Sequence, residues 1–352
     1  MNISEMKQNI ELAFAANQPT MIWGSPGCGK SQGVEQVAKE LNMKFIDVRL
    51  SQMDAVDLRG IPFRDKETNR TDWAVPNIWP TDDVPTVIMF DEINHGTQST
   101  LSAAFQAIQE RRIGDFHFPP SVRFLAAGNR AKDRTFANQM PSALRNRFSH
   151  ITVESSEDDF CKYANSSGFA QLVTGFIRFS PVSLDEFTEH NKSTEEQKRV
   201  SAVKKNNAFA TPRSWEAVSK LINCVTTIDK NGTELVDLNR AKKMVIGTIG
   251  ESEASKFFGY ANFYKDLPDL NKLIKNPMNY DVPTAPEMQY AICAGLANKA
   301  TTGNFANVIK YILRLPAEFQ AMAVNDALAR DVLLSTTPAF ATWASNNTDV
   351  IF

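Results

Sequence analysis

The sequence has few cysteines, no long apolar run and no excess of charge of one sign. Its four cysteines, Cys28, Cys161, Cys224 and Cys293, are far apart and form no CxxC pair. This spacing argues against a zinc site and a disulfide framework, and it indicates the reducing cytoplasm. The N-terminal stretch MNISEMKQNIELAF contains acidic residues and lacks the apolar core of a targeting signal. Because no run approaches the roughly 18 apolar residues of a membrane span, we expect no membrane contact.

The charge balance also limits the possible partners. The formal net charge is −2 at pH 7, which gives no bulk attraction to nucleic acid or to an anionic membrane. Binding to either would need a local basic patch. With 352 residues, 43% of them apolar and 22% charged, the chain can bury a core and has room for two domains or slightly more.

The most informative segment is GSPGCGKS at residues 24–31, a complete GxxxxGK[ST] loop. Its glycines let backbone N–H groups line a nest for phosphates, Lys30 can reach the β and γ oxygens, and Ser31 can ligate Mg²⁺. An apolar run at 20–23 precedes the loop and a helical pattern at 33–41 follows it, which is the expected context. We therefore expect a nucleoside triphosphate and Mg²⁺ to bind here. The assigned residues are Gly24, Ser25, Pro26, Gly27, Cys28, Gly29, Lys30, Ser31 and Gln32.

Apolar runs alternate with helical patterns in the first part of the chain. The predicted strands are 20–23, 44–49, 86–90, 122–127 and 149–153. Continuous apolar runs such as VPTVIMF are typical of parallel strands that are buried on both faces, so we predict an α/β domain over residues 1–153. Beyond it, helical patterns are broken by prolines and no strand is convincing. A turn signal, IDKNGT, divides this helical part into residues 154–225 and 226–352.

Polar residues follow two of the predicted strands. Asp91 and Glu92 come directly after VPTVIMF, at the end of a strand where open α/β sheets bind ligands. Asp91 would hold Mg²⁺ and Glu92 would act as the general base on the attacking water. The alternative is that both residues only open the following helix. Asn129 ends FLAAGN and could help to orient the water, or it could simply belong to a turn.

With MPSALRNRFSH at 140–150, these motifs resemble the AAA+ ATPases in order and spacing. SQMDAVDLRGIP at 51–62, DEIN at 91–94 and QAIQERRIGDFHFPPSVRFLAAGN look like the MoxR and dynein-related branch. This branch has an extra hairpin between the second and third strands, which would be residues 60–76 here. The resemblance implies a P-loop NTPase sheet with helices on both faces, followed by a helical lid. It covers about residues 1–225, and nothing is carried over to the helical extension at 226–352.

The resemblance also assigns three arginines. Arg147, of the RF pair, corresponds to a finger that enters the neighbouring subunit's site, and Arg145 is the runner-up. Both could instead be solvated arginines at a helix end. Arg213, in ATPRSWEAVSKLI, is similar to the sensor 2 arginine of the lid. A cation is unfavourable at a helix N-terminus, which supports a functional role for Arg213.

The predicted function is an AAA+ ATPase that forms a ring, a hexamer by resemblance, and uses ATP. Its work would be to remodel a partner protein, or to insert a cofactor or metal into it. A von Willebrand factor A domain protein is the partner that the resemblance suggests. The alternative is a nucleic-acid motor or the nucleotide-driven subunit of a restriction-like complex, which DNA-stimulated ATPase activity would favour. A switch without turnover is a third class, but Glu92 and the finger position are both filled.

Overall fold

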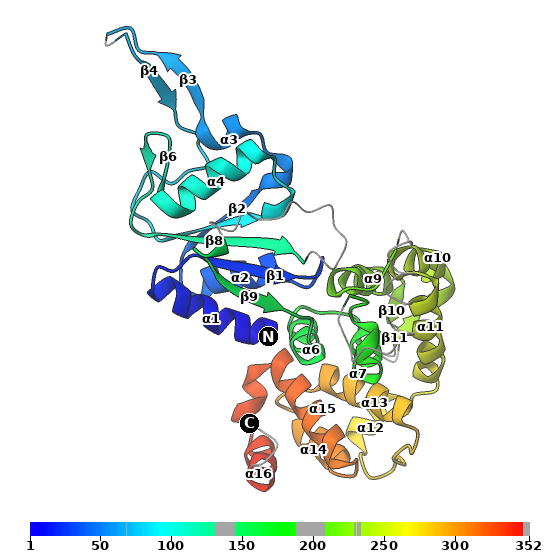
Figure 1. The fold of residues 1–352 in the computed structure, drawn as a ribbon. Helices are drawn as coiled ribbons and strands as arrows, with labels where there is room; N and C mark the ends of the chain where they lie inside the picture. Colours follow the sequence, from blue (N-terminus) through cyan, green and yellow to red (C-terminus); the bar gives the residue numbers. More distant parts are fainter. Residues whose placement is uncertain (68, 131–144, 188–207, 229, 231–233, 348–352) are drawn as a thin grey trace. The chain divides into compact units, whose positions relative to one another are not determined.

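The computed structural model describes residues 1–352 apart from 68, 131–144, 188–207, 229, 231–233 and 348–352. The chain divides into two compact units, Met1–Glu154 and Ser155–Phe352 (Figure 1). Each unit has its own hydrophobic clusters. Among the residues described, no helix combines the length and the apolar character needed to cross a membrane.

The first unit is built around strands that alternate with helices, as predicted. Its described elements are α1 (Ile3–Ala15), β1 (Thr20–Gly24), α2 (Lys30–Glu40), β2 (Lys44–Arg49), η1 (Leu50–Gln52), α3 (Ala55–Arg59), β3 (Ile61–Arg64), β4 (Thr71–Ala74), β5 (Thr86–Asp91), η2 (Ile93–His95), α4 (Gln98–Glu110), β6 (Arg112–Ile113), β7 (Phe116–His117), β8 (Val122–Asn129) and β9 (Ser149–Val153).

One parallel sheet contains all five predicted strands, in the order β2-β5-β8-β1-β9. β1, β5 and β8 end one or two residues later than predicted. After β1 the chain crosses to β2 at one edge of the sheet. The last strand, β9, pairs with β1 on the side away from β8. The strand order therefore reverses at β1, which is where open α/β sheets bind their ligands.

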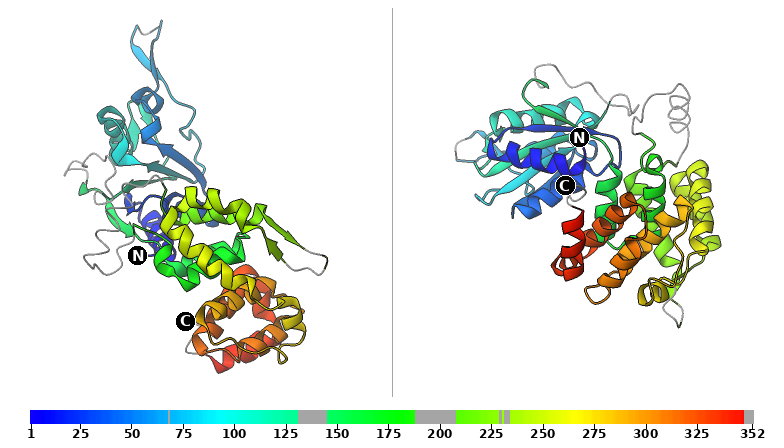
Figure 2. Two further views of the ribbon diagram at one scale, coloured as in Figure 1. Left: turned by 90° about the vertical axis from the view of Figure 1, so that its right-hand side faces the viewer. Right: turned by 90° about the horizontal axis from the view of Figure 1, so that it is seen from below.

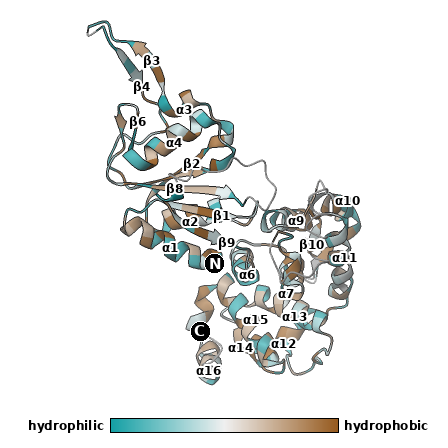
Figure 3. Ribbon diagram, in the orientation of Figure 1, coloured by the Kyte–Doolittle hydropathy of each residue, from teal (hydrophilic) through white to brown (hydrophobic). Residues whose placement is uncertain are grey.

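Helices cover both faces of this sheet because successive strand residues point to opposite faces. On one face, Met21, Ile88, Phe90, Phe124 and Ala126 pack with the apolar side of α4. On the other face, Ile22, Val87, Met89, Leu125 and Ala127 pack with α1 and α2. Figure 3 shows hydrophilic and hydrophobic residues alternating around α1 and α4. The predicted P-loop type of sheet, with helices on both faces, is confirmed.

The hairpin predicted at 60–76 is present as β3 and β4, which pair antiparallel with each other. Along the chain it lies between β2 and β5, the second and third strands of the large sheet. Gly60 has φ +90°, and a Cβ atom there would lie 2.0 Å from the carbonyl oxygen of Ala74, so only glycine fits. Figure 2 shows the hairpin projecting from its unit. Ile61 and Phe63 on β3 are exposed.

The second unit is mainly helical, as predicted. Its described elements are α6 (Glu157–Ser166), α7 (Gln171–Phe179), η4 (Pro181–Ser183), α9 (Pro212–Cys224), β10 (Thr226–Ile228), β11 (Glu234–Val236), α10 (Leu238–Ile249), α11 (Glu251–Lys265), α12 (Leu270–Lys275), α13 (Pro286–Lys299), α14 (Phe305–Ile312), α15 (Ala317–Arg330), η5 (Val332–Thr336) and α16 (Pro338–Asn346).

One sequence expectation needs correction in this unit. No strand was expected after residue 153, but β10 and β11 form an antiparallel hairpin on either side of the predicted turn. Each strand has only three residues, which is too short for a period of two to be recognised. The β-branched residues Thr226, Thr227 and Ile228 are the local signal that favours a strand here.

Two hydrophobic clusters hold the second unit together. The first contains buried residues of α6, α7, α9, α10 and α11, with Ala291 of α13. The second contains residues of α12 to α16, including Ile292 and Leu296 of α13. Helix α13 therefore contributes to both clusters, and the predicted boundary at 225/226 lies inside the first one.

A buried ion-pair network links three helices of this unit. Arg178 on α7 contacts Glu157 at 2.7 Å and Asp158 at 2.5 Å on α6, and Asp326 at 2.7 Å on α15. The side chains of Arg178 and Asp326 are 6% and 3% exposed. Burial raises the pKa of the Asp326 carboxyl, while Arg178 opposes this shift. The guanidinium is thus the main counter-charge of the buried Asp326 carboxylate.

We expect Arg178→Met to lower the free energy of unfolding by about 3–5 kcal/mol, because it leaves the buried Asp326 carboxylate without its counter-charge. Urea unfolding, followed by the far-ultraviolet circular dichroism of the helices, measures the change in the free energy of unfolding. Lys220→Met is the matched control, since it removes the 72% exposed cation of a pair with Glu216 and should cost less than about 1 kcal/mol. Adding Asp326→Leu to Arg178→Met should recover part of the loss. Equal effects of the two single variants would contradict the assigned role of the network.

Candidate active site

The loop between β1 and α2 has the backbone of an anion nest. Gly27 and Gly29 have φ of 76° and 95°, values that favour glycine. Gly29 is the N-cap of α2, and no side chain caps this helix. The N–H groups of the first turn of α2 are therefore not taken by a side-chain cap, which suits them to bind phosphate oxygens. The loop is also tight, because a Cβ atom on Gly24 would lie 2.8 Å from the Cys28 sulfur.

Lys30 lies across this loop with its ammonium group buried. Nζ donates to the carbonyl oxygens of Gly24 at 3.1 Å and Ser25 at 2.9 Å. It also donates to Oδ1 of Asn129 at 3.2 Å. The structure thus brings together the lysine of the loop and the asparagine at the end of β8, two residues that the sequence assigned from separate motifs.

Ser31 and Asp91 are the second pair of predicted residues that meet. The Ser31 hydroxyl donates to Oδ2 of Asp91 at 2.6 Å. A hydroxyl and a carboxylate are the hard oxygen ligands that Mg²⁺ prefers, and Mg²⁺ commonly takes only one or two protein ligands beside phosphate oxygens and waters. The residues present therefore fit a magnesium ion.

Glu92 has an unusual backbone conformation directly after β5. Its φ and ψ are 52° and 36°, a left-handed conformation that is unfavourable for a residue with a Cβ atom. Its N–H donates to Oδ1 of Asp91 at 2.8 Å. Its carboxylate accepts a hydrogen bond from the Ser51 hydroxyl. The turn thus separates two adjacent carboxylates, one beside Ser31 and the other beside Ser51.

The sequence interpretation missed Ser51 and Arg49. Arg49 ends β2 and is in register with Asp91 on β5, and its guanidinium donates to Asp47 at 2.9 Å. Burial raises the pKa of Asp47, and Asp91 and Glu92 add to the shift. The signal that could have identified Arg49 and Ser51 was the pairing of parallel strands. Residues that end β2 lie at the same edge of the sheet as residues that end β5. This edge, at which the strands end, is called the carboxyl edge below.

Asn94 is a further residue that the sequence did not assign. It is 5% exposed, and its Nδ2 donates to the backbone carbonyl of Asn129 at 2.9 Å. A Cβ atom on Gly128 would lie 3.0 Å from Oδ1 of Asn94, so glycine permits this close approach. Asn94 therefore links the residue that ends β8 to the turn that follows β5.

Arg147 lies at the opposite edge of the sheet, where the strands begin. It precedes β9, whose first residue, Ser149, is in register with Thr20 at the start of β1. The full length of β1, roughly 13 Å at 3.3 Å per residue, separates this level from the P-loop. The Arg147 guanidinium donates to Oε1 of Gln109. Arg147 thus cannot serve the P-loop of its own chain without rearrangement.

The other predicted arginines are placed as follows. Arg145 is exposed, and its carbonyl oxygen lies 2.7 Å from Nε2 of His150. Arg213 is exposed in the first turn of α9, behind a capping box of Thr211 and Ser214, and belongs to the second unit. Residues 140–144 of the MPSALRNRFSH segment lie outside the described residues.

Comparison with known families finds a match that covers most of the first unit. Residues 20–155 match the ATPase family associated with various cellular activities (AAA). The chain is also 32% identical over 107 residues to Protein CbbQ of Hydrogenophilus thermoluteolus. The aligned part is 30% of this chain and 39% of CbbQ.

Solved structures to which the chain is similar include RuvB from Thermotoga maritima. The RuvB Holliday junction branch migration motor is 15% identical, with a TM-score of 0.39 over 89% of this chain and 86% of that one. A RuvB mutant from the same organism is 14% identical, with a TM-score of 0.40 over 84% and 83% of the two chains. Similarity at this level gives no functional argument.

Proposed function

We propose that the chain is a MoxR-like member of the AAA+ class that works as a ring. The premise is that residues 20–155 are an AAA ATPase domain, which is a nucleotide-binding domain that hydrolyses ATP. The observation that carries this proposal is the division of polar residues between the two edges of one sheet. Lys30, Ser31, Asp91, Glu92 and Asn129 meet at the carboxyl edge, and Arg147 lies at the other. One chain therefore offers most of a hydrolytic site at one edge of the sheet and the candidate finger, Arg147, at the other.

ATP would bind with its phosphates against residues 24–32. The backbone N–H groups of the loop donate to phosphate oxygens, and the Lys30 ammonium places a positive charge beside them. Ser31 and Asp91 would hold Mg²⁺, which when bound neutralises charge on the phosphate oxygens. Lys30 already bonds to Asn129, so phosphates that draw Lys30 toward them would also change the bonding of Asn129.

Glu92 would act as the general base. The water oxygen attacks the γ-phosphorus, the bond from that phosphorus to the oxygen of ADP breaks, and the water's proton passes to the Glu92 carboxylate. The Ser51 hydroxyl, which donates to that carboxylate, fixes its orientation. Asn129 would orient the same water from the end of β8, and the bond from Asn94 holds the backbone of Asn129.

Arg147 would complete the site of the neighbouring subunit, because it lies at the edge where the strands begin, which we call the amino edge. This position keeps it from its own P-loop. Arg145 is the second candidate for this role. Arg213 would report the state of the γ-phosphate to a helical lid at residues 154–225. The extension at 226–352 would then move with the lid.

The work done by the ring would be remodelling of a partner protein, or insertion of a cofactor or metal into it. The motifs at 51–62 and 91–94, which resemble the MoxR branch, support this class. We expect a cytoplasmic hexamer, and a partner with a von Willebrand factor A domain is the first to test. The nucleic-acid alternative is less favoured because a net charge of −2 gives no bulk attraction to a polyanion.

We expect the rate of phosphate release per protomer to rise steeply with protein concentration and then to level off. The reason is that the finger and the P-loop of one site come from two chains. Steady-state assays over a dilution series, with ATP and GTP, measure this rate, and Glu92→Gln protein serves as the blank. A low and flat rate in a protein that stays monomeric would argue against catalysis between subunits.

A further inference from the structure

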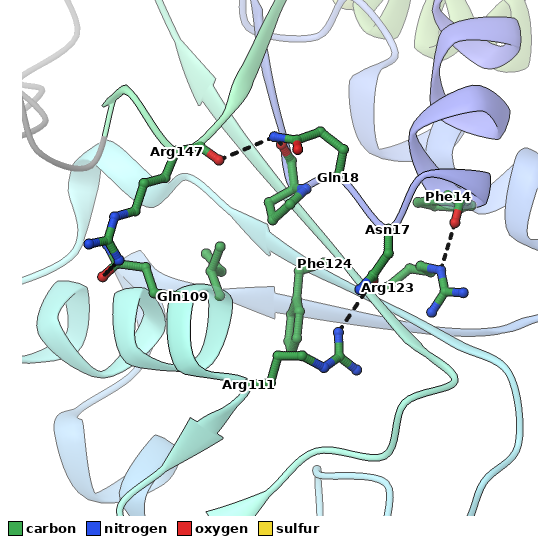
Figure 4. Close-up of a pocket in the computed structure, with 10 residues that line it drawn as sticks. Phe14, Asn17, Gln18, Gln109, Arg111, Arg123, Phe124 and Arg147 are labelled. Atoms are coloured by element: carbon green, nitrogen blue, oxygen red, sulfur yellow. Dashed lines mark hydrogen bonds between the residues drawn. The ribbon is translucent and has the colours of Figure 1, made fainter.

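A cavity of about 250 Å³ opens at the amino edge of the sheet in the first unit (Figure 4). It lies between the C-terminal ends of α1 and α4 and the start of β8. Ten residues line it, and those that matter below are Asn17, Gln109, Arg111, Arg123, Phe124 and Arg147. Three of these ten residues are arginines and none is acidic. We call this cavity the arginine pocket.

The three guanidinium groups are bonded to neutral acceptors. Arg111 donates to Oδ1 of Asn17 at 3.4 Å and to the carbonyl oxygens of Pro119 at 2.6 Å and Val122 at 3.2 Å. Arg123 donates to the carbonyl oxygens of Phe14 and Pro120, both at 2.8 Å. Arg147 donates to Gln109.

Within the part of the chain that the structure describes, no carboxylate forms an ion pair with Arg111, Arg123 or Arg147. The neighbouring Glu110 instead pairs with Arg112 at 2.8 Å. Among the described residues, the three positive charges of the arginine pocket therefore have no counter-charge.

Two of these charges, those of Arg111 and Arg123, also oppose one another. Burial lowers the pKa of Arg111, and the nearby Arg123 lowers it further. The Arg111 guanidinium lies 5.5 Å from the centre of the Phe124 ring, so an apolar surface covers one of its sides. Like charges beside an apolar wall are screened less than charges in open water. An anion in the cavity would relieve this repulsion.

We propose that the arginine pocket binds a compact oxyanion and that inorganic phosphate is its ligand. A guanidinium group presents a fork of N–H donors that matches phosphate and carboxylate oxygens. Arg111 follows α4, Arg123 lies in β8 and Arg147 precedes β9, and all three border one small cavity. The proposal rests on these three side chains and does not depend on ATP hydrolysis by the chain.

Asn17→Asp is the substitution that tests the arginine pocket. Asn17 follows α1 with φ 51°, a conformation that aspartate also tolerates. The new carboxylate would stand where Oδ1 of Asn17 now accepts from Arg111, and would take the place of the bound anion. Asn42→Asp is the matched control, since Asn42 follows α2 with φ 53° and is exposed outside the pocket. Both changes place the same charge just beyond a helix C-terminus.

Equilibrium dialysis with labelled inorganic phosphate at fixed ionic strength measures binding. The P-loop is first filled with a non-hydrolysable ATP analogue and Mg²⁺. We expect Asn17→Asp to weaken phosphate binding by at least about tenfold, while the wild-type and Asn42→Asp proteins bind equally. Gln109→Glu offers a second route, because it adds a carboxylate beside Arg147, and should give the same loss.

Two results would overturn the proposal. The first is no saturable phosphate binding by the wild-type protein at millimolar concentration. The second is equal binding by the Asn17→Asp and Asn42→Asp proteins. If Asn17→Asp instead changes only self-association in sedimentation, the anion is a carboxylate of a second copy and not phosphate. A chain that binds phosphate here but does not hydrolyse ATP would leave this inference standing and remove the proposed function.

Discussion

Arg147→Ala is expected to lower the steady-state rate of ATP hydrolysis by about 10³–10⁵-fold, the range seen when an arginine finger is absent. Binding of ATP should be retained, because Arg147 precedes β9 at the amino edge while the phosphate nest follows β1 at the other. The loss arises because the Arg147 guanidinium would stabilise the charge that develops on the transferring phosphoryl group in the neighbouring site. Phosphate release and the binding of a fluorescent ATP analogue, measured on the same protein, separate the two effects.

Arg145→Ala is the matched comparison, since it removes an exposed arginine two residues away. If its effect is the larger one, the roles of the two arginines are exchanged. Mixing Arg147→Ala protein with Glu92→Gln protein should restore part of the activity, because some interfaces then pair an intact base with an intact finger. Absence of rescue in mixtures that demonstrably co-assemble would show that Arg147 does not act on a neighbour.

Glu92→Gln is expected to lower turnover by about 10²–10⁴-fold, which is the usual contribution of a general base. Binding should persist, because the phosphate contacts belong to residues 24–32 and Glu92 is not among them. The amide keeps the size of the side chain, and its oxygen can still accept from Ser51, so the left-handed turn after β5 should survive. Single-turnover assays with saturating ATP measure the chemical step directly.

Glu110→Gln is the control for this second variant. Glu110 ends α4, and its carboxylate pairs with the partly exposed Arg112, so its loss should leave turnover within about twofold. Near-normal turnover in the Glu92→Gln protein would remove Glu92 as the base. A loss of ATP binding in that protein would mean that the turn, and not the proton transfer, had been damaged.

The sequence predicted the elements whose signals are local. The parallel strands are continuous apolar runs, and the loop at residues 24–31 has a fixed spacing of glycines and lysine. The hairpin at 60–76 came from family resemblance. Because their motifs are also local, Lys30, Ser31, Asp91 and Asn129 could be named before their contacts were known. Local patterns fix the identity of these residues, and the parallel sheet then fixes their proximity.

Features that depend on contacts between distant segments were missed. Ser51 meets Glu92 only because β2 and β5 are neighbours in the sheet. Arg178 finds Asp326 across 148 residues of sequence. The sequence assigned Arg147 on its own, and Arg111 and Arg123 border the same cavity only because the ends of α1 and α4, the start of β8 and the segment before β9 pack together. The division of residues 154–352 at 225/226 and the role of Arg213 remain predictions.

The cluster that joins α7, α9 and α11 has a consequence for where the chain can be cut. The rings of Phe176 and Trp215 lie 5.5 and 5.7 Å from that of Phe257, and Phe257 is fully buried. A chain that stopped at residue 225 would remove Phe257 and the other buried residues of α10 and α11 from this cluster, so we expect this truncation to produce an aggregating fragment and not a smaller ATPase. Ile228 and Leu235 of the β10–β11 hairpin, just beyond that point, are exposed. An insertion there would disturb little of the packed interior. We therefore expect the chain to tolerate an inserted domain in the β10–β11 hairpin but not a truncation just before it.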